Sequence, residues 1–132
     1  MKFNFPELPR GAKISAVYKM IFDGGYFYIG SALNLKQRMN GWKFKMSNGI
    51  FKNHKVGIAF KNTTTVTFEI LEVVDDPVFR RYREDGYIKI NFGNELCLNI
   101  APSAYNSVGV KHTNPNKKKR PPNYSQMRKV LS

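Results

Sequence analysis

The sequence predicts an α/β fold, in which a small and mostly antiparallel sheet of three strands is flanked by helices. Two segments rich in β-branched and aromatic residues flank an Asp-Gly-Gly turn, and a third alternating segment follows near the middle of the chain. Two further segments show helical periodicity. With 132 residues, the chain has the length of a single domain with one core.

The first two strands are expected over residues 14–22 and 26–30. Both segments carry β-branched and aromatic side chains, and the Asp-Gly-Gly sequence at residues 23–25 is typical of a tight turn between paired strands. Alternate residues of a strand share one face of the sheet. The hairpin therefore allows Tyr18 and Tyr28 to project from the same face.

A helix is expected near residues 32–46. Ser31 or Asn34 can serve as its N-cap, because both side chains accept hydrogen bonds from the first turn of a helix. Arg38 is predicted to border the buried stripe rather than to occupy the centre of the polar face. The apolar side chains that recur at helical spacing, and so form this stripe, are Leu35, Met39 and Trp42.

The remaining elements follow in order along the chain. Residues 47–62 have weak periodicity and are interpreted as a basic loop, with a short helix as the alternative. Residues 65–74 alternate as a third strand. Asp76, followed by proline, predicts the start of a helix over residues 77–91. Gly86 weakens that helix by about 1 kcal/mol relative to alanine, which favours either a short helix or a compensating contact.

The composition changes after residue 110. Residues 111–132 contain seven basic residues, no acidic residue and few aliphatic residues. Such a segment cannot form its own core, and it is either a solvated end or an arm that neutralises phosphates. We therefore divide the chain into a folded domain, residues 1–110, and a basic tail, residues 111–132.

The charge of the chain favours a polyanionic partner. It has 22 Lys and Arg against 9 Asp and Glu, a net charge of +13. Nucleic acid, an anionic membrane surface and a ribosome are all compatible with this charge. No apolar run has the length of a membrane span or of a signal peptide, so we expect a cytoplasmic protein with no membrane partner.

Cys97 is the single cysteine of the chain. A single cysteine excludes an internal disulfide and any zinc site built from several thiolates. Its side chain is interpreted as a small buried hydrophobic group, with a catalytic thiol as the alternative.

Five motifs together resemble the GIY-YIG nuclease family over residues 14–101. The Gly-Ile-Tyr triplet of that family is replaced here by Ala-Val-Tyr, which keeps the tyrosine. The motifs are Ala16-Val17-Tyr18, Tyr28-Ile29-Gly30, Asn34-Leu35 followed by Arg38, Glu84 before Tyr87-Ile88, and Asn99 within Leu-Asn-Ile.

This resemblance implies an endonuclease that hydrolyses DNA phosphodiester bonds with one Mg²⁺ or Mn²⁺ ion. Glu84 is then the metal ligand, which suits magnesium because that ion can use a single carboxylate together with water and phosphate. Arg38 would hold the scissile phosphate through its planar guanidinium. Tyr18 would activate or orient the attacking water, and Tyr28 would support the phosphate or the base. Asn99 would orient either Glu84 or the end of a strand.

Simpler interpretations of the same residues remain open. Glu84 lies in a strongly charged run and could form only surface ion pairs, while the two tyrosines could be core aromatics. The neighbouring Asp85 is expected to point elsewhere and to be solvated. His54 is either an auxiliary base or an exposed loop residue. Trp42 stands where some family members place a histidine, and it is interpreted as a core residue.

The expected partner is double-stranded DNA, with no small-molecule cofactor and with a transient dimer on DNA as one possibility. The resemblance favours a homing endonuclease of a phage or mobile element, which would act in the cytoplasm of the host cell. A restriction endonuclease and a catalytically inactive nucleic-acid-binding module are the alternatives. The basic residues predicted to bind nucleic acid are Lys36, Lys43, Lys45, Lys52, Lys117, Lys118, Lys119 and Arg120.

Overall fold

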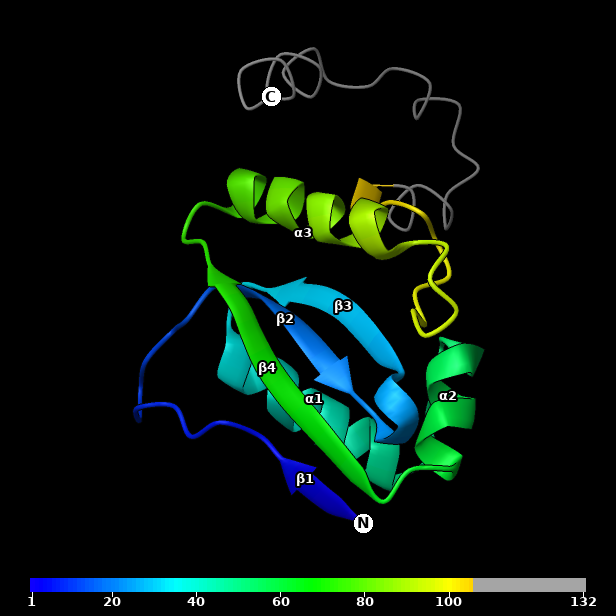
Figure 1. The fold of residues 1–132 in the computed structure, drawn as a ribbon. Helices are drawn as coiled ribbons and strands as arrows, with labels where there is room; N and C mark the ends of the chain where they lie inside the picture. Colours follow the sequence, from blue (N-terminus) through cyan, green and yellow to red (C-terminus); the bar gives the residue numbers. More distant parts are fainter. Residues whose placement is uncertain (106–132) are drawn as a thin grey trace.

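A computed structural model describes residues 1–105 of the chain (Figure 1). The predicted tail, with Lys117, Lys118, Lys119 and Arg120, lies outside the described residues. In chain order the elements are β1 (Lys2–Asn4), β2 (Ala16–Ile21), η1 (Asp23–Gly25), β3 (Phe27–Ala32), α1 (Leu35–Ser47), α2 (His54–Lys61), β4 (Thr65–Val73) and α3 (Pro77–Asn91).

The sheet has the strand order β1-β4-β2-β3, so β3 forms one edge. Strand β2 pairs antiparallel with both β3 and β4, whereas β1 pairs parallel with β4. The α/β class and the three predicted strands are confirmed, but the prediction of only three strands was wrong. The short β1 adds a fourth strand and makes the sheet mixed, and its three residues are too few to show an alternating pattern.

The hairpin of β2 and β3 places the two tyrosines on one face. Tyr18 is opposite Gly30, and Met20 is opposite Tyr28, so the tyrosines are separated by one pair and project in the same direction. The turn between the strands needs glycine because the backbone φ is 82° at Gly24 and 87° at Gly25. This turn continues into the edge strand that carries the second tyrosine.

The three α-helices begin at polar caps. Asn34 accepts a hydrogen bond from the first turn of α1, which selects it over Ser31 as the cap of that helix. Asn53 caps α2 in the same way, so the region interpreted as a loop contains a regular helix of eight residues. Asp76 caps α3 with two backbone hydrogen bonds, and proline occupies the start of the helix as expected.

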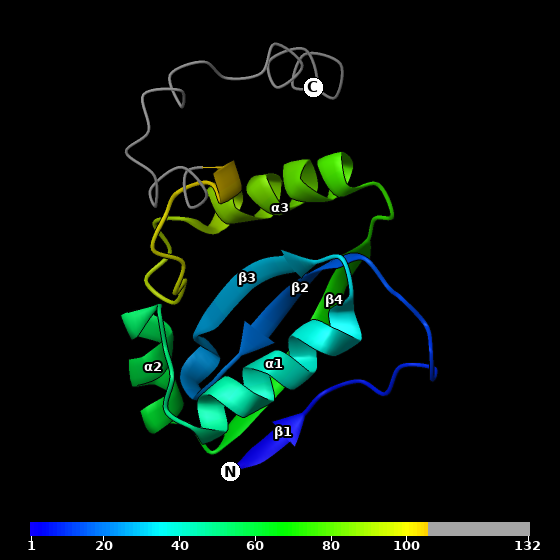
Figure 2. The same ribbon diagram turned by 180° about the vertical axis from the view of Figure 1, so that it is seen from behind.

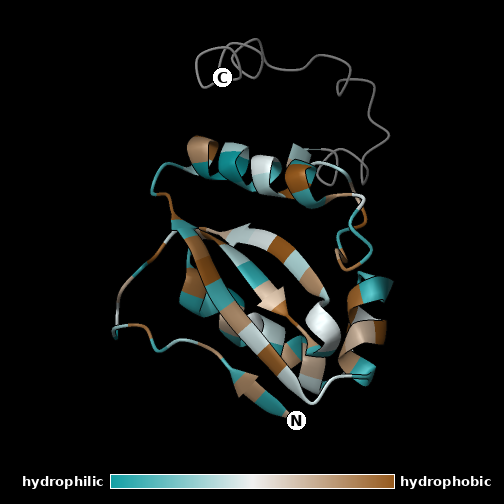
Figure 3. Ribbon diagram, in the orientation of Figure 1, coloured by the Kyte–Doolittle hydropathy of each residue, from teal (hydrophilic) through white to brown (hydrophobic). Residues whose placement is uncertain are grey.

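Helices cover both faces of the sheet (Figures 1 and 2). Tyr18 and Met20 of β2 pack with Leu35 and Met39 of α1 on one face. Val17 of β2 packs with residues of β3 and with Ile88 of α3 on the other face. Figure 3 shows the corresponding alternation of hydrophobic and polar residues along the strands. The edge strand β3 therefore lies where two separately packed helices, α1 and α3, can both reach it.

Helix α3 runs without interruption through Gly86. A Cβ atom added at Gly86 would meet no other atom within 4 Å, so no close contact explains this glycine. No helix within residues 1–105 has the length and apolarity needed to cross a membrane.

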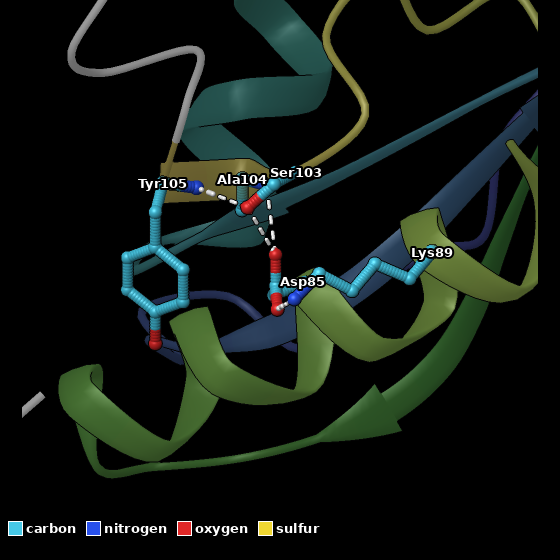
Figure 4. Close-up of polar contacts among 5 residues, drawn as sticks. All are labelled: Asp85, Lys89, Ser103, Ala104 and Tyr105. Carbon is cyan, nitrogen blue, oxygen red and sulfur yellow. Dashed lines mark hydrogen bonds and ion pairs between the residues drawn. The ribbon is translucent and has the colours of Figure 1, made fainter. Parts of the chain in front are cut away.

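The prediction that Asp85 is solvated was wrong. Its side chain is only 2% exposed, accepts hydrogen bonds from the Ser103 hydroxyl and the Ala104 backbone N–H, and pairs with Lys89 at 3.1 Å (Figure 4). Residue 85 faces the segment that returns after α3 rather than solvent. The carboxylate of Asp85 thus fixes this returning segment against the helix.

The returning segment also adds to the edge of the sheet. The backbone of Leu98 donates a hydrogen bond to Phe27, and the single bridge between Phe27 and Cys97 is parallel. Cys97 is 7% exposed and packs in the core beneath α3, as expected for a small hydrophobic group.

Candidate active site

Ser31, at the end of the edge strand β3, joins residues from both helical layers. Its hydroxyl donates a hydrogen bond to the Glu84 carboxylate at 2.5 Å and accepts one from Arg80 at 3.3 Å. Its backbone carbonyl accepts a hydrogen bond from Arg38 at 3.0 Å. Arg38 belongs to α1 and Glu84 to α3, so Ser31 brings an arginine and a carboxylate from opposite faces of the sheet to one place.

Tyr18 lies beside this junction. Its side chain is fully buried, and its ring stacks on Phe68 with the centroids 4.4 Å apart. The hydroxyl passes directly over Gly30, where an added Cβ atom would lie 2.5 Å from the tyrosine oxygen. The glycine of the Tyr-Ile-Gly motif is therefore required because a larger residue would displace the Tyr18 hydroxyl.

Two nitrogen donors converge on the Tyr18 hydroxyl. The indole N–H of Trp42 donates a hydrogen bond at 3.0 Å, and the Arg38 guanidinium lies at 3.5 Å. Because an indole N–H is only a donor, the tyrosine oxygen acts as acceptor toward Trp42, and its own proton is directed elsewhere. Burial nevertheless raises the pKa of Tyr18, and this effect outweighs the lowering by Arg38 and Trp42. In this state Tyr18 is a neutral phenol at neutral pH.

Tyr28 lies on the same face as Tyr18, as predicted, and packs edge-on against Trp42 with ring centroids 5.6 Å apart. Burial raises the pKa of Tyr28, and the neighbouring Tyr18 and Glu84 raise it further. Tyr28 is therefore also neutral, and it can act as a hydrogen-bonding group but not as a charged one.

Glu84 faces Ser31 and takes no part in the ion pairs of α3. Those pairs join Arg83 to Glu72 and Lys89 to Asp85. Burial raises the pKa of the Glu84 carboxyl, while the hydrogen bond from Ser31 and the charges of three nearby arginines lower it in part. The arginines are Arg81, Arg80 and Arg38. In this environment a metal cation could pair with the Glu84 carboxylate, and an anionic phosphate could pair with the arginines.

The donor set at Glu84 fits a metal ion that keeps most of its ligands from solvent and substrate. Within residues 1–105, no group of three or more His, Cys, Asp or Glu side chains is placed to hold a metal. The described residues provide Glu84 with one hydrogen bond, to Oε1, and none of them donates to Oε2. One available carboxylate oxygen matches Mg²⁺, which is often bound through one or two carboxylates plus water and phosphate oxygens.

Asn99 contacts the edge strand and not Glu84. Its side chain accepts a hydrogen bond from the Ile29 N–H at 3.0 Å and donates one to the Ile29 carbonyl at 2.8 Å. These two bonds pair the amide with the outer edge of β3 in the way a neighbouring strand would. Of the two roles considered for Asn99, the geometry favours holding a strand, here the strand that carries Tyr28 and Ser31.

A cleft of about 580 Å³ opens beside Tyr28, between α1 and the start of α2. We call it the α1–α2 cleft, and the aromatic and basic residues that line it are Tyr28, Arg38, Trp42, Lys45, Phe51 and Lys52. None of the residues that line it in the described part of the chain is acidic. The cleft is thus a cationic and partly aromatic concavity that begins at Arg38.

Among the described residues, two of the predicted basic residues, Lys36 and Lys43, do not line the α1–α2 cleft. The ammonium of Lys43 lies 5.2 Å from the centroid of the Phe5 ring. Lys36 lies two helical turns before Lys43 in α1, and its side chain is exposed. His54 is exposed at the first position of α2, directly after Asn53, which does line the cleft. The structure thus brings Tyr18, Tyr28, Arg38 and Glu84 together, and it leaves His54 outside their contacts.

Three residues of this site were not predicted as functional. Ser31 was considered only as a helix cap, Trp42 only as a core residue, and Arg80 was not considered. Two weak signals existed: Ser31 directly follows the Tyr-Ile-Gly motif, and Arg80 precedes Glu84 by one helical turn, which places both on one side of α3. The contact of Trp42 with Tyr18 depends on packing between a helix and a strand, which no local pattern encodes.

The fold is similar to that of a solved endonuclease catalytic domain. The catalytic domain of the homing endonuclease I-TevI has a TM-score of 0.59 and 22% sequence identity, over 66% of this chain and 98% of that chain. A point mutant of the same catalytic domain has a TM-score of 0.61 at 22% identity, over 68% of this chain and 96% of that chain. The sequence matches no protein-family model, and no curated protein is similar to it. The structural likeness confirms the GIY-YIG resemblance at the level of the fold.

Proposed function

We propose that this protein is a metal-dependent endonuclease that hydrolyses phosphodiester bonds of DNA. The observation that carries the proposal is the junction at Ser31, where Arg38 and Glu84 meet beside the hydroxyl of Tyr18. Cleavage of a phosphodiester needs a positioned cation for the phosphate charge and an acceptor for the proton of water. The junction and the cationic cleft together supply groups for binding the phosphate.

Arg38 is the group proposed to bind the scissile phosphate. In the free protein its guanidinium lies within reach of the Tyr18 hydroxyl and the Ser31 carbonyl, both of which are neutral acceptors. A phosphate oxygen is a stronger partner because the hydrogen bond is then charge-assisted on both sides. Arg38 can therefore move to a phosphate without leaving a buried charge unpaired, since it is exposed.

Glu84 is the residue proposed to hold one Mg²⁺ or Mn²⁺ ion through its carboxylate. When bound, such an ion would polarise the phosphoryl oxygen and lower the pKa of a coordinated water. The hydrogen bond from Ser31 orients the carboxylate, and burial raises the pKa of Glu84 above its ordinary value. The pKa of Tyr18 is also raised, so we propose that Tyr18 orients the water as a neutral phenol.

The biological type proposed is a homing endonuclease of a phage or mobile element, and the fold shared with the catalytic domain of the homing endonuclease I-TevI supports the homing type. The surplus of positive charge suits double-stranded DNA as the substrate, because binding is then driven by release of counterions. One such site cuts one strand at a time, so a double-strand break would need two binding events or a transient dimer.

The test is cleavage of a supercoiled plasmid by the full chain in Mg²⁺, in Mn²⁺ and in EDTA, with a gel-shift assay on the same DNA. We expect nicked plasmid in both metals and none in EDTA, while DNA binding persists in EDTA. Tight binding without cleavage in any metal would instead show a nucleic-acid-binding module. A preference for RNA together with no effect of metal would support a ribosome-binding protein.

A further inference from the structure

We infer that the α1–α2 cleft receives an unstacked base, so that the preferred substrate is DNA with an unpaired nucleotide beside the cleavage site. This inference rests on the proposed function, because it concerns the substrate class of the same site. It follows from the shape of the cleft, from the kind of residue that lines it, and from its continuity with Arg38 and Tyr28.

The lining of the cleft contains more apolar surface than phosphate binding requires. Trp42, Tyr28 and Phe51 contribute aromatic rings, and Ile50, which also lines the cleft, is 49% exposed. Phosphates are bound by cations and N–H donors, whereas bases are bound by stacking on aromatic and apolar side chains. An aromatic cleft between cations is therefore typical of a site for an unstacked base together with its own phosphates.

The cations are arranged to hold the backbone on either side of such a base. Arg38 of α1 lines the cleft and also contacts the Tyr18 hydroxyl. Lys52, from the segment before α2, also lines it, and the Lys45 ammonium lies 5.7 Å from the centroid of the Trp42 ring. Lys45 is exposed, so an entering base can replace it over the indole and leave it free to pair with a phosphate.

The dimensions also favour a single nucleotide over a duplex. A concavity of about 580 Å³ falls in the range of sites that enclose a small molecule, roughly 300–1,000 Å³. A duplex is far too wide to enter it, and would contact only the rim. Enzymes that act beside a base gain access most easily where that base is already unpaired, because no pairing has to be broken.

Gly41 keeps the cleft open. It lies in the middle of α1 and lines the cleft, and an added Cβ atom would meet nothing within 4 Å. A glycine inside a helix is unfavourable, and here no protein atom requires it. A larger side chain at this position would project into the cleft without disturbing the packed face of the helix.

The experiment compares binding of two short DNAs that differ only by one unpaired, bulged nucleotide, in EDTA so that neither is cut. The fluorescence of Trp42 reports contact directly, because it is the only tryptophan in the chain. We expect the bulged DNA to bind about tenfold more tightly, as expected for one stacked base, and to quench Trp42. The paired DNA should leave the Trp42 emission nearly unchanged.

The decisive variant is Gly41→Leu, which fills the cleft, with Asn40→Leu as the matched control. Asn40 is the exposed neighbour in the same helix and does not line the cleft. Gly41→Leu should abolish both the tenfold preference and the quenching, while Asn40→Leu should keep them. Equal affinity of the wild type for the two DNAs, with unchanged Trp42 emission, would overturn the inference.

A separate arm keeps this result apart from the proposed function. Both DNAs are incubated with Mg²⁺, and cleavage is measured. Equal cleavage of both, with equal binding, would leave the nuclease intact and refute the base-binding cleft. Preferential binding of the bulged DNA without cleavage of either would support the cleft and refute the nuclease.

Discussion

Ser31 influences the ionisation of Glu84. Its hydroxyl hydrogen bond favours the charged carboxylate and partly offsets the burial that raises the pKa of Glu84. A carboxylate must be deprotonated to bind a metal. The rate of DNA cleavage should therefore increase as the pH rises through the raised pKa of Glu84, and it should be low at pH values below that pKa. The acid limb of the pH profile of cleavage therefore reports on Glu84.

We predict that Ser31→Ala shifts this acid limb to higher pH. Loss of the hydrogen bond removes an interaction that favours the carboxylate, so the pKa of Glu84 rises further. The cleavage rate of wild type and variant should converge at alkaline pH and differ most on the acid side, as measured under single-turnover conditions. Superimposable pH profiles would show that Ser31 does not influence Glu84.

Trp42 provides the Tyr18 hydroxyl with a donor. We predict that Trp42→Phe, which keeps an aromatic ring but lacks the N–H, lowers the single-turnover rate about tenfold, as expected for one hydrogen bond. Trp42→His should recover part of this loss, because an imidazole also offers an N–H. A Trp42→Phe variant that cuts as fast as Trp42→His would mean that the ring matters only for packing.

The order of the motifs along the sequence was sufficient to predict the four residues that meet at the site, Tyr18, Tyr28, Arg38 and Glu84. It was not sufficient for Ser31 or Trp42, because their contacts depend on how α1 and α3 approach the edge strand. Sequence patterns report the buried face of an element, but not which donor on one element reaches which acceptor on another.

At the scale of elements, helix α3 carries two features with opposite effects on stability. Gly86 is unfavourable in the helix, and an added methyl group meets no atom within 4 Å. We predict that Gly86→Ala raises the free energy of unfolding by about 1 kcal/mol. The melting temperature should increase by about 3–5 °C in a thermal scan. A lower melting temperature would reveal a contact or a conformational need for glycine at this position.

Asp85 has the opposite role, because it holds the returning segment against α3. Asp85→Ala leaves the buried Ser103 hydroxyl and the Ala104 N–H without this acceptor, and we predict a loss of about 2–4 kcal/mol in the free energy of unfolding. Lys89→Ala, which removes only the exposed partner, should lose less than about 1 kcal/mol. Equal losses in chemical denaturation would mean that the ion pair, and not the anchoring of the segment, provides the stability.

Helices and strands were predicted correctly where local sequence signals were strong. The prediction failed where tertiary contacts determine the structure. Asp76 with its proline correctly predicted the start of α3, and the Asp-Gly-Gly turn correctly predicted the hairpin. Strand β1 has only three residues, and it is a strand because it pairs with β4. Its own sequence is too short to predict a strand. Asp85 was misplaced because its partners come from a segment whose path the sequence does not reveal.

For the whole molecule, the functional consequence of the fold is that two helical layers meet at one edge of the sheet. Helix α1 brings Arg38 and Trp42 from one face, and α3 brings Glu84 and Arg80 from the other. Strand β3 carries Tyr28 and Ser31 between them, and Asn99 holds that strand from outside. The groups proposed to be catalytic are therefore held by packed elements, apart from the exposed cations of the cleft.

The most direct test of this arrangement is single-turnover cleavage in Mg²⁺ by Glu84→Gln compared with Glu72→Gln. Both changes remove one carboxylate charge, but Glu72 pairs with Arg83 and Tyr87 away from the site. The proposal predicts that Glu84→Gln cuts at least about 1,000-fold more slowly while binding DNA normally, since the metal is then lost. It also predicts near wild-type cleavage by Glu72→Gln. Comparable cleavage by the two variants would contradict a metal site at Glu84.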